Sequence, residues 1–245
     1  MDDVLSRLLQ VVTETGAVQP GNHRFRLPTE RDLAASLGVP RSLVRERLAA
    51  LEHLGVVERT QGSGTYVNPP SAEVIRWYFD LALALGYIGI DEIQTTRAML
   101  EREIARQAAR VAAPDDVAEL DHLCQRMTEA SSPDERAAID NDFHLRLALA
   151  ARNPVILLIV DGLASVLRRV LARRRALVAS IPDAAQKQDA AHPPIVEAIR
   201  ARDPERAAVA MDEHFRVTDE LLARSHSLLV ATPPAASDAH TPRRP

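Results

Sequence analysis

The chain has 245 residues, of which 46% are hydrophobic, and its formal net charge is −4. This size allows two domains with buried cores, and the single cysteine, Cys124, excludes an internal disulfide and fits a reducing cytosol. The most apolar run, from Val155, is interrupted by Asp161 and Arg168, and the start, MDDVLSRLLQ, lacks the basic region of a signal peptide. We therefore expect a soluble cytoplasmic protein without a membrane partner, in which Cys124 is a buried structural thiol.

The negative total hides an uneven distribution of charge. Residues 24–59 hold seven arginines against five acidic residues, whereas residues 69–245 hold 22 basic against 26 acidic residues. A nucleic acid responds to the local charge of the surface that it meets. The total therefore does not exclude nucleic-acid binding through residues 24–59.

The N-terminal part of the chain predicts a helix-turn-helix. Residues 2–16 have the pattern of a short amphipathic helix that can pack on the segment that follows. Thr29 can cap a second short helix, which Gly38 ends. A third helix starts near Arg41 and places apolar residues on one arc before Gly55 ends it. Two helices joined by a tight turn with glycine are typical of DNA-binding proteins.

Two arginines of the third helix are placed for DNA contact. Arg41 and Arg45 lie side by side just beyond its apolar arc, in the first turns, where recognition helices present side chains to base edges. Arginine can donate two hydrogen bonds to guanine there. Arg47 falls inside the apolar arc, so we expect its stem to lie on the core instead. The alternative is an ordinary helical subdomain whose arginines are simply solvated.

A β-hairpin is predicted to follow these helices. The β-prone runs VVERT and TYV flank the glycine turn QGSG, which is the pattern of a hairpin wing. Its glycines allow the backbone to approach a phosphate or a groove closely.

The stretch from LPTERDLAASLGVPRSLVRERLAALEHLGVV to GSGTYV closely resembles the N-terminal domain of the GntR family of bacterial transcription regulators. The resemblance implies operator contacts from Arg31, Arg41, Ser42, Arg45 and, at the wing tip in the minor groove, Gly64. One position departs from the family, which usually has serine where this chain has Pro40. Because proline lacks a capping hydroxyl but is tolerated at a helix start, we expect Pro40 to weaken this helix without abolishing DNA binding.

Residues 73–228 predict an all-α bundle of six or seven helices, since no convincing strand pattern occurs there. Asn153 before Pro154, and Asp203 before Pro204, are typical of a helix cap followed by a first-turn proline. The helical patterns between Gly, Pro and Asp signals cover residues 73–85, 91–112, 115–130, 134–151, 154–179, 193–202 and 204–226.

The whole chain is thus predicted to be mainly α-helical and to contain two domains. A winged helix-turn-helix with a small β-hairpin wing occupies residues 1–68, and the two prolines of NPPSAE make residues 69–72 a linker. Residues 73–228 form the helical domain. Residues 229–245 carry Pro, Ala and polar residues without periodicity, so we expect a disordered tail.

Four residues of the helical domain suggest a metal site. Asp140 and His144 are four residues apart on a predicted helix and project from one face, whereas His192 precedes one helix and His214 sits within another. Taken singly, each histidine is more often a surface or hydrogen-bonded residue than a ligand. Together, one oxygen and three nitrogens from three helices are compatible with a bound metal. The spacing alone fits no short-range ligand pattern.

Three segments, TTRAMLEREIARQAA, IDNDFHLRLALAARNP and AAHPPIVEAIRARDPERAAVAMDEHF, are similar to the FCD domain, the effector-binding and dimerisation domain of the FadR subfamily of GntR regulators. The resemblance implies a divalent metal bound by Asp140, His144, His192 and His214. We expect zinc, with nickel or manganese as alternatives. Such an ion keeps net positive charge and can leave positions open for an effector carboxylate.

Two further expectations concern the surroundings of this metal. By the same resemblance Arg97 helps to hold an acidic effector, whereas the spacing alone favours an i,i+4 ion pair between Arg97 and Glu101, which contributes little when it is exposed. Pro193 and Pro194 directly follow His192. We expect them to force the backbone of His192 away from helical angles and so to move that ligand.

We predict a ligand-responsive transcription regulator, without enzyme activity, that acts as a repressor. It would bind a palindromic double-stranded operator as a homodimer, and a small organic acid at the metal site would release or modulate it. Two alternatives remain open. One is a metal-dependent hydrolase with a DNA-binding appendage, and the other is a regulator that senses the metal ion itself.

Overall fold

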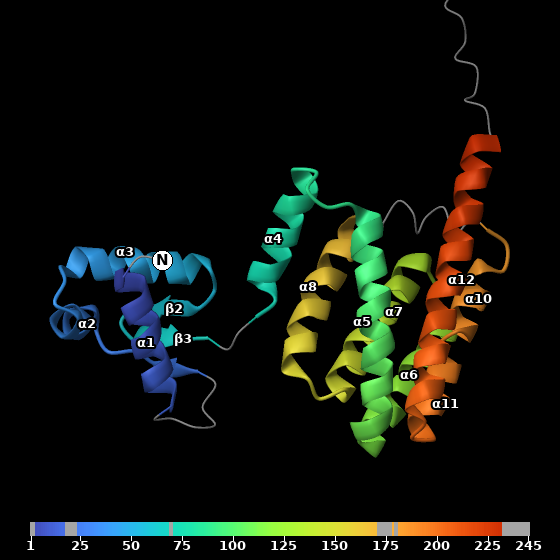
Figure 1. The fold of residues 1–245 in the computed structure, drawn as a ribbon, viewed down its shortest axis with the longest axis horizontal. Helices are drawn as coiled ribbons and strands as arrows, with labels where there is room; N and C mark the ends of the chain where they lie inside the picture. Colours follow the sequence, from blue (N-terminus) through green and yellow to red (C-terminus); the bar gives the residue numbers. More distant parts are fainter. Residues whose placement is uncertain (1–2, 18–23, 69–70, 171–177, 179–180, 232–245) are drawn as a thin grey trace, which may run out of the picture. The chain divides into compact units, whose positions relative to one another are not determined.

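The computed structural model describes residues 3–17, 24–68, 71–170, 178 and 181–231, which are mainly α-helical (Figure 1). The chain divides into two compact units, Met1–Leu81 and Ala82–Pro245, and each has its own hydrophobic core. The division falls within helix α4 (Glu73–Ala84). Residues 69 and 70 of the predicted linker lie outside the described residues, so the linker stays a prediction. The predicted fold class, a winged helix-turn-helix followed by an all-α region, is confirmed.

The N-terminal unit is a small helical core with a sheet beside it. Its elements are α1 (Asp3–Ala17), β1 (Phe25–Arg26), α2 (Glu30–Leu37), α3 (Arg41–His53), β2 (Val57–Thr60) and β3 (Gly64–Val67). Leu8 of α1, Leu33 of α2 and Leu48 of α3 are at most 1% exposed in one cluster. The predicted packing of the first helix on the DNA-binding segment is therefore confirmed, and burial of these side chains removes apolar surface from water.

Local signals set the ends of α2 and α3. The Thr29 side chain accepts a hydrogen bond from the amide of Asp32 at 3.3 Å, and Gly38 ends α2 with φ of 64°, in the left-handed region that glycine adopts without strain. Pro40 precedes α3 and supplies no side-chain cap. Its carbonyl instead accepts from the amides of Leu43 and Val44, so α3 begins on backbone contacts alone.

The wing belongs to a three-stranded antiparallel sheet with strand order β1-β3-β2. Thr60 pairs with Gly64 across a turn at residues 61–63, which confirms the predicted hairpin. The sequence did not reveal β1, because two residues are too few to display the alternation of a strand. Phe25 pairs with Val67, which ties the wing to the chain segment before α2.

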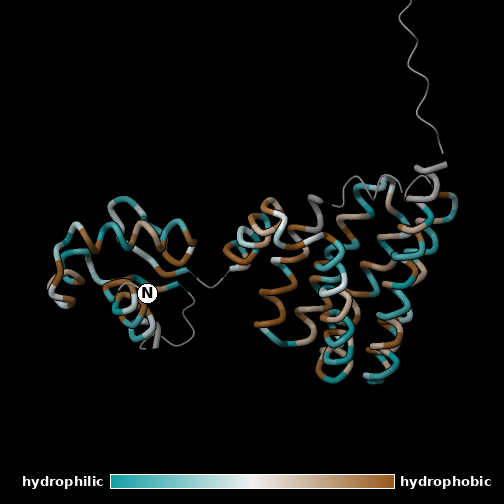
Figure 2. The backbone as a smooth tube through the Cα atoms, turned by 45° about the horizontal axis from the view of Figure 1, so that its top comes forward, coloured by the Kyte–Doolittle hydropathy of each residue, from teal (hydrophilic) through white to brown (hydrophobic). Residues whose placement is uncertain are grey.

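The C-terminal unit is a helical bundle. Its helices after α4 are α5 (Ile90–Val111), α6 (Pro114–Glu129), α7 (Pro133–Ala150), α8 (Pro154–Val170), α10 (Ala184–Ala190), α11 (Pro193–Arg200) and α12 (Pro204–Ala231). Ile104, Phe143 and Ile199 are among the fully buried side chains of its main core. Hydrophobic and hydrophilic residues alternate along these helices (Figure 2), as amphipathic helices around a core require.

Two helix caps and a buried cysteine that the sequence predicts are present in the bundle. Asn153 accepts from the amide of Val155 at 3.1 Å, and Asp203 from that of Arg206 at 3.0 Å, which confirms both caps. Cys124 is buried, and burial raises the pKa of its thiol to about 12, as a structural cysteine requires. Helix α10 was not predicted, because seven residues show too little periodicity.

Some predictions reach beyond what the structure describes. The end of the predicted helix 154–179 falls on residues 171–177 and 179–180, and most of the predicted disordered tail falls on residues 232–245; both lie outside the described residues. Helix α12 reaches Ala231, five residues past its predicted end at 226. Within the described part of the chain, no helix is long and apolar enough to cross a membrane.

Candidate functional site

The four residues predicted as metal ligands lie together in the C-terminal unit. Helix α7 supplies Asp140 and His144, the start of α11 supplies His192, and α12 supplies His214. One possible ligand atom from each residue lies within 4.8 Å of the others. The three histidines are at most 5% exposed, whereas the side chain of Asp140 is 35% exposed. Three separate helices thus bring one carboxylate and three imidazoles to one point.

The hydrogen bonds of His192 leave a gap for a cation. Its Nδ1 lies 3.0 Å from the carbonyl oxygen of Gln188, which can only accept, so Nδ1 carries a proton. Its Nε2 lies 3.1 Å from Oδ1 of Asp140. In a neutral imidazole protonated on Nδ1, Nε2 is also an acceptor. Two acceptors at this distance need a proton or a metal ion between them, and the second would satisfy both.

Glu101 of α5 holds Nδ1 of His144, as the Gln188 carbonyl holds Nδ1 of His192. The Glu101 carboxylate contacts Nδ1 of His144, and both side chains are at most 2% exposed. Nε2 of His144 then faces Oδ1 of Asp140, 3.7 Å away. A carboxylate behind a histidine fixes the tautomer and ring orientation of metal-binding histidines. The sequence indicated Glu101 only as a partner of Arg97, because its contact with His144 joins two different helices.

Arg97 is buried against Glu101 rather than exposed beside it. Its Nε donates to Oε1 of Glu101 at 2.5 Å, and its guanidinium lies 5.7 Å from the ring centre of Phe215. The i,i+4 pair expected from spacing therefore exists, and it is buried, because its side chains are only 10% and 1% exposed. The Nη2 atom of Arg97 is buried without a partner among the described residues.

The charges of the cluster agree with a cation site. Burial would raise the pKa of Asp140, but the neighbouring rings of His144 and His192 outweigh this effect and hold the pKa well below its usual range. Burial and the neighbouring histidines lower the pKa of His214 far below its usual value, so this imidazole is neutral and its Nδ1 has no partner among the described residues. Burial would lower the pKa of His144, but the Glu101 carboxylate outweighs this effect and raises it, so a metal ion would take the place of a proton on this ring. A carboxylate and neutral imidazoles are the donors that zinc and related divalent ions use.

The two prolines after His192 do not displace it. His192 has φ of −83° and ψ of −46°, within the helical region, so the expectation of a non-helical backbone is wrong. Its carbonyl accepts from the amides of Ile195 and Val196, which makes it the first acceptor of α11. The ring also packs edge-on against Phe143, with ring centres 4.8 Å apart. Tertiary packing has overridden the local preference of a residue before proline.

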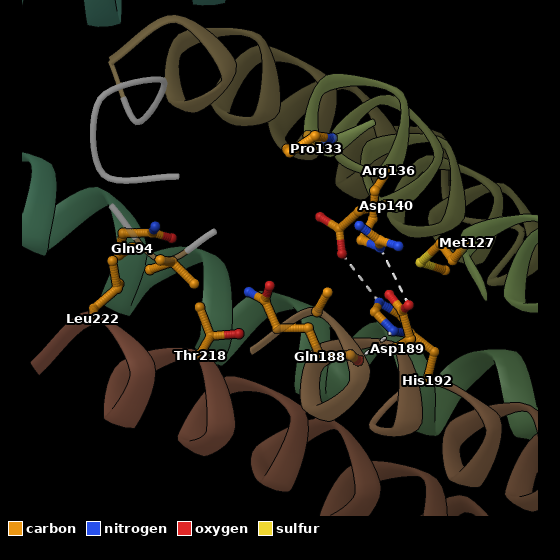
Figure 3. Close-up of a pocket in the computed structure, with 13 residues that line it drawn as sticks. Gln94, Met127, Pro133, Arg136, Asp140, Gln188, Asp189, His192, Thr218 and Leu222 are labelled. Carbon is orange, nitrogen blue, oxygen red and sulfur yellow. Dashed lines mark hydrogen bonds and ion pairs between the residues drawn. The ribbon is translucent and has the colours of Figure 1, made fainter. Parts of the chain in front are cut away.

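A cavity of about 120 Å³ borders the cluster. Asp140 and His192 line it, and their contact is visible in Figure 3 together with an ion pair between Arg136 and Asp189. Arg97 is not among the lining residues. A small molecule in this cavity would therefore meet the Asp140–His192 edge of the cluster, whereas Arg97 lies behind Glu101.

In the N-terminal unit, the predicted DNA contacts are exposed. Arg41 and Arg45 are 61% and 58% exposed, and both donate to Oε2 of Glu30 at 3.1 Å. Glu30 was not predicted as their shared partner, because it lies on a different helix, 11 and 15 positions away in the sequence. Arg47, in contrast, is 27% exposed and pairs with Glu46, in agreement with its exclusion as a base reader.

Three further residues were predicted to contact DNA. Arg31 is 85% exposed on α2, and Ser42 is exposed beside Arg41. Gly64 starts β3 with φ of 121°, and a Cβ atom there would lie 2.7 Å from Nε of Arg26. Their contact with DNA stays a prediction.

The chain is similar to known regulators along most of its length. Residues 9–67 match the family described as bacterial regulatory proteins, gntR family, and residues 92–217 match the FCD domain. The putative L-lactate dehydrogenase operon regulatory protein of Escherichia coli K12 is 29% identical over 235 residues, which cover 91% of this chain and 86% of that protein. The transcriptional repressor NanR of Cronobacter sakazakii is 32% identical over 206 residues, covering 77% and 74%.

A solved structure supports the fold. The GntR protein of Streptococcus agalactiae superposes with a TM-score of 0.68 at 24% identity, over 89% of this chain and 97% of that one. At this identity the likeness concerns the fold alone. The relatives by sequence are named as regulators, in agreement with the prediction of a protein that is not an enzyme.

Proposed function

Because the chain belongs to the gntR family of bacterial regulatory proteins and carries an FCD domain, in a FadR-like arrangement, we propose that it is a repressor controlled by a small organic acid. It binds a palindromic operator as a homodimer, and the acid enters the cavity beside Asp140. Members of this family bind DNA and effectors.

The observation that carries the proposal is the cluster of Asp140 and three buried histidines beside a cavity. A divalent ion bound there would supply positive charge and an open position for a carboxylate. Glu101 orients His144, and the carbonyl of Gln188 orients His192. These partners hold two ligands in place before any ion or acid arrives, which reduces the conformational entropy lost on binding.

Arg97 has a secondary role in this proposal. Its buried Nη2 lacks a partner among the described residues, and a buried guanidinium nitrogen favours an anionic acceptor. Because Arg97 lies behind Glu101 and not in the cavity wall, its contribution to an acid in the cavity is mainly its charge.

The DNA side of the proposal rests on the exposed face of α3. Arg41, Ser42 and Arg45 enter the major groove, Arg31 also contacts the operator, and the wing at Gly64 reaches the minor groove. Two copies related by a two-fold axis require a nearly symmetric operator. The acid must bind one arrangement of the dimer better than the other in order to change operator affinity.

The test uses full-length protein and an operator selected from a random pool of duplexes. Operator affinity is measured by fluorescence anisotropy with chelator alone, zinc alone, acid with chelator, and zinc with acid, using a panel of small carboxylates. We expect release only when zinc and an acid are both present. Release by zinc alone would make the metal the signal, and no change in any arm would contradict regulation through this site.

A further inference from the structure

A second pair of polar residues lines the cavity, and neither of them is among the predicted site residues. Arg136 of α7 donates from Nε to Oδ2 of Asp189, at the end of α10, over 3.2 Å. Their side chains are 23% and 8% exposed, and both line the cavity. In Figure 3 this pair and the Asp140–His192 contact lie side by side. The pair brings together residues that are 53 positions apart in the sequence.

The pair lies close to the metal-binding edge but is distinct from it. Arg136 precedes Asp140 by four residues in α7, which is a rise of about 6 Å along the helix. Asp189 precedes His192 by three residues. A molecule whose carboxylate sits at the Asp140–His192 edge would therefore reach the pair with a second polar group.

The pair has hydrogen-bonding capacity left. A guanidinium has five N–H donors and a carboxylate has about four acceptor positions. Among the described residues, Arg136 and Asp189 use one of each for their mutual bond. The polar groups nearby, from Gln94, Gln188 and Thr218, are neutral. Among the described residues, this pair and its neutral neighbours thus offer both donors and acceptors, with no net charge.

This charge balance selects the kind of group that fits. A second carboxylate could accept from Arg136 but would meet the negative charge of Asp189 in a partly buried place, which is unfavourable. A hydroxyl can accept from Arg136 and donate to Asp189 at once. The volume of about 120 Å³ suits a molecule of this size, since a cavity of about 150 Å³ can hold benzene.

We propose that Arg136 and Asp189 recognise a hydroxyl group of the effector, which makes the effector a hydroxy monocarboxylic acid rather than a dicarboxylic acid. This inference rests on the proposed function, because it assumes that an acid enters the cavity with its carboxylate toward Asp140. It adds two specificity-determining residues, Arg136 and Asp189, to that function.

Calorimetric titration of zinc-loaded full-length protein at pH 7.5 tests the proposal with butyrate, 4-hydroxybutyrate and succinate, which share a four-carbon chain. A hydrogen bond to a charged group is expected to make 4-hydroxybutyrate bind about tenfold more tightly than butyrate. Succinate should bind less tightly than 4-hydroxybutyrate. Arg136→Gln should remove the advantage of the hydroxyl, whereas Arg146→Gln should keep it. Arg146 lies on the same helix, half-exposed and outside the cavity wall.

A second variant changes the preference instead of removing it. Asp189→Asn keeps the size of the side chain but removes its charge, so succinate should gain affinity relative to 4-hydroxybutyrate. If Arg136→Gln fails to fold, as judged from its thermal unfolding and zinc content, Asp189→Asn still tests the proposal.

The outcomes separate this inference from the proposed function. Acids that bind wild-type protein with equal affinity, or a hydroxyl advantage that survives in Arg136→Gln, would overturn the role of the pair and leave the acid site intact. A preference for succinate in wild-type protein would also overturn it. If no acid binds zinc-loaded wild-type protein, the proposed effector itself is wrong, and this inference falls with it.

Discussion

Both units of the chain set arginines against a glutamate, but in opposite surroundings. Around Glu30, Arg41 and Arg45 are more than half exposed, whereas Arg97 and Glu101 are at most 10% exposed. An exposed pair contributes little free energy, so water or another partner can replace it readily. A buried pair cannot be separated without leaving a charge in a poorly solvated place. We infer that the first arrangement is suited to exchange with DNA and the second to holding a site in shape.

The largest expected effect comes from breaking the buried pair. Glu101→Ala leaves the Arg97 guanidinium and the His144 imidazole without their carboxylate, so the free energy of unfolding should fall by about 3–5 kcal/mol. Urea unfolding of metal-free protein measures it. Glu103→Ala, on the same helix but half-exposed beside Arg106, should change little. Equal losses in the two variants would remove the distinction between buried and exposed pairs.

The next effect concerns the cluster that Glu101 supports. His144→Ala combined with His214→Ala should lose the bound metal, and with it a stabilisation of about 2.7 kcal/mol when free zinc is a hundred times its dissociation constant. Metal content after gel filtration and thermal unfolding with and without zinc measure both consequences. His122→Ala, exposed on α6, is the control. One ion per chain in the double variant would show that these residues do not hold the metal.

A smaller effect is expected at the exposed pair. Arg45→Ala should weaken operator binding by about 1–3 kcal/mol, and the loss should concern one base position, because a base-reading arginine contacts one guanine. Competition among duplexes varied at each position measures it, with sedimentation to check that dimerisation is unchanged. Arg47→Ala, which removes the partly buried neighbour, should leave the base preference unchanged. An unchanged preference in Arg45→Ala would refute its role.

The smallest effect is at the start of α3. Pro40→Ser supplies the missing cap and should stabilise the N-terminal unit by about 1 kcal/mol without abolishing operator binding. Pro40→Ala separates the gain of a hydroxyl from the loss of the proline ring. Lower stability together with lost binding in Pro40→Ser would contradict the assignment of Pro40 as a tolerated helix start.

The sequence predicted the structural features that depend on residues close together in the chain. The caps at Thr29 and Asn153, the turn at Gly38 and the common face of Asp140 and His144 follow from spacings of a few residues. The ligand set as a whole needed the family resemblance, because His192 lies 48 positions after His144 in the sequence. Residues whose roles arise from tertiary contacts were missed, namely Glu30, Glu101 as a partner of His144, Arg136 and Asp189. Strand β1 and helix α10 were too short to show a period.

Gly64 has a consequence for how the wing can vary over evolutionary time. Two barriers oppose a side chain there, and they differ in kind: the guanidinium of Arg26 can move aside, but the φ angle of 121° belongs to the backbone of the hairpin. Replacing Arg26 by a shorter residue therefore removes only the steric clash, and the unfavourable φ angle at position 64 remains. Positions 26 and 64 cannot compensate for each other, so a lineage of this protein is free to change the first and must keep the second.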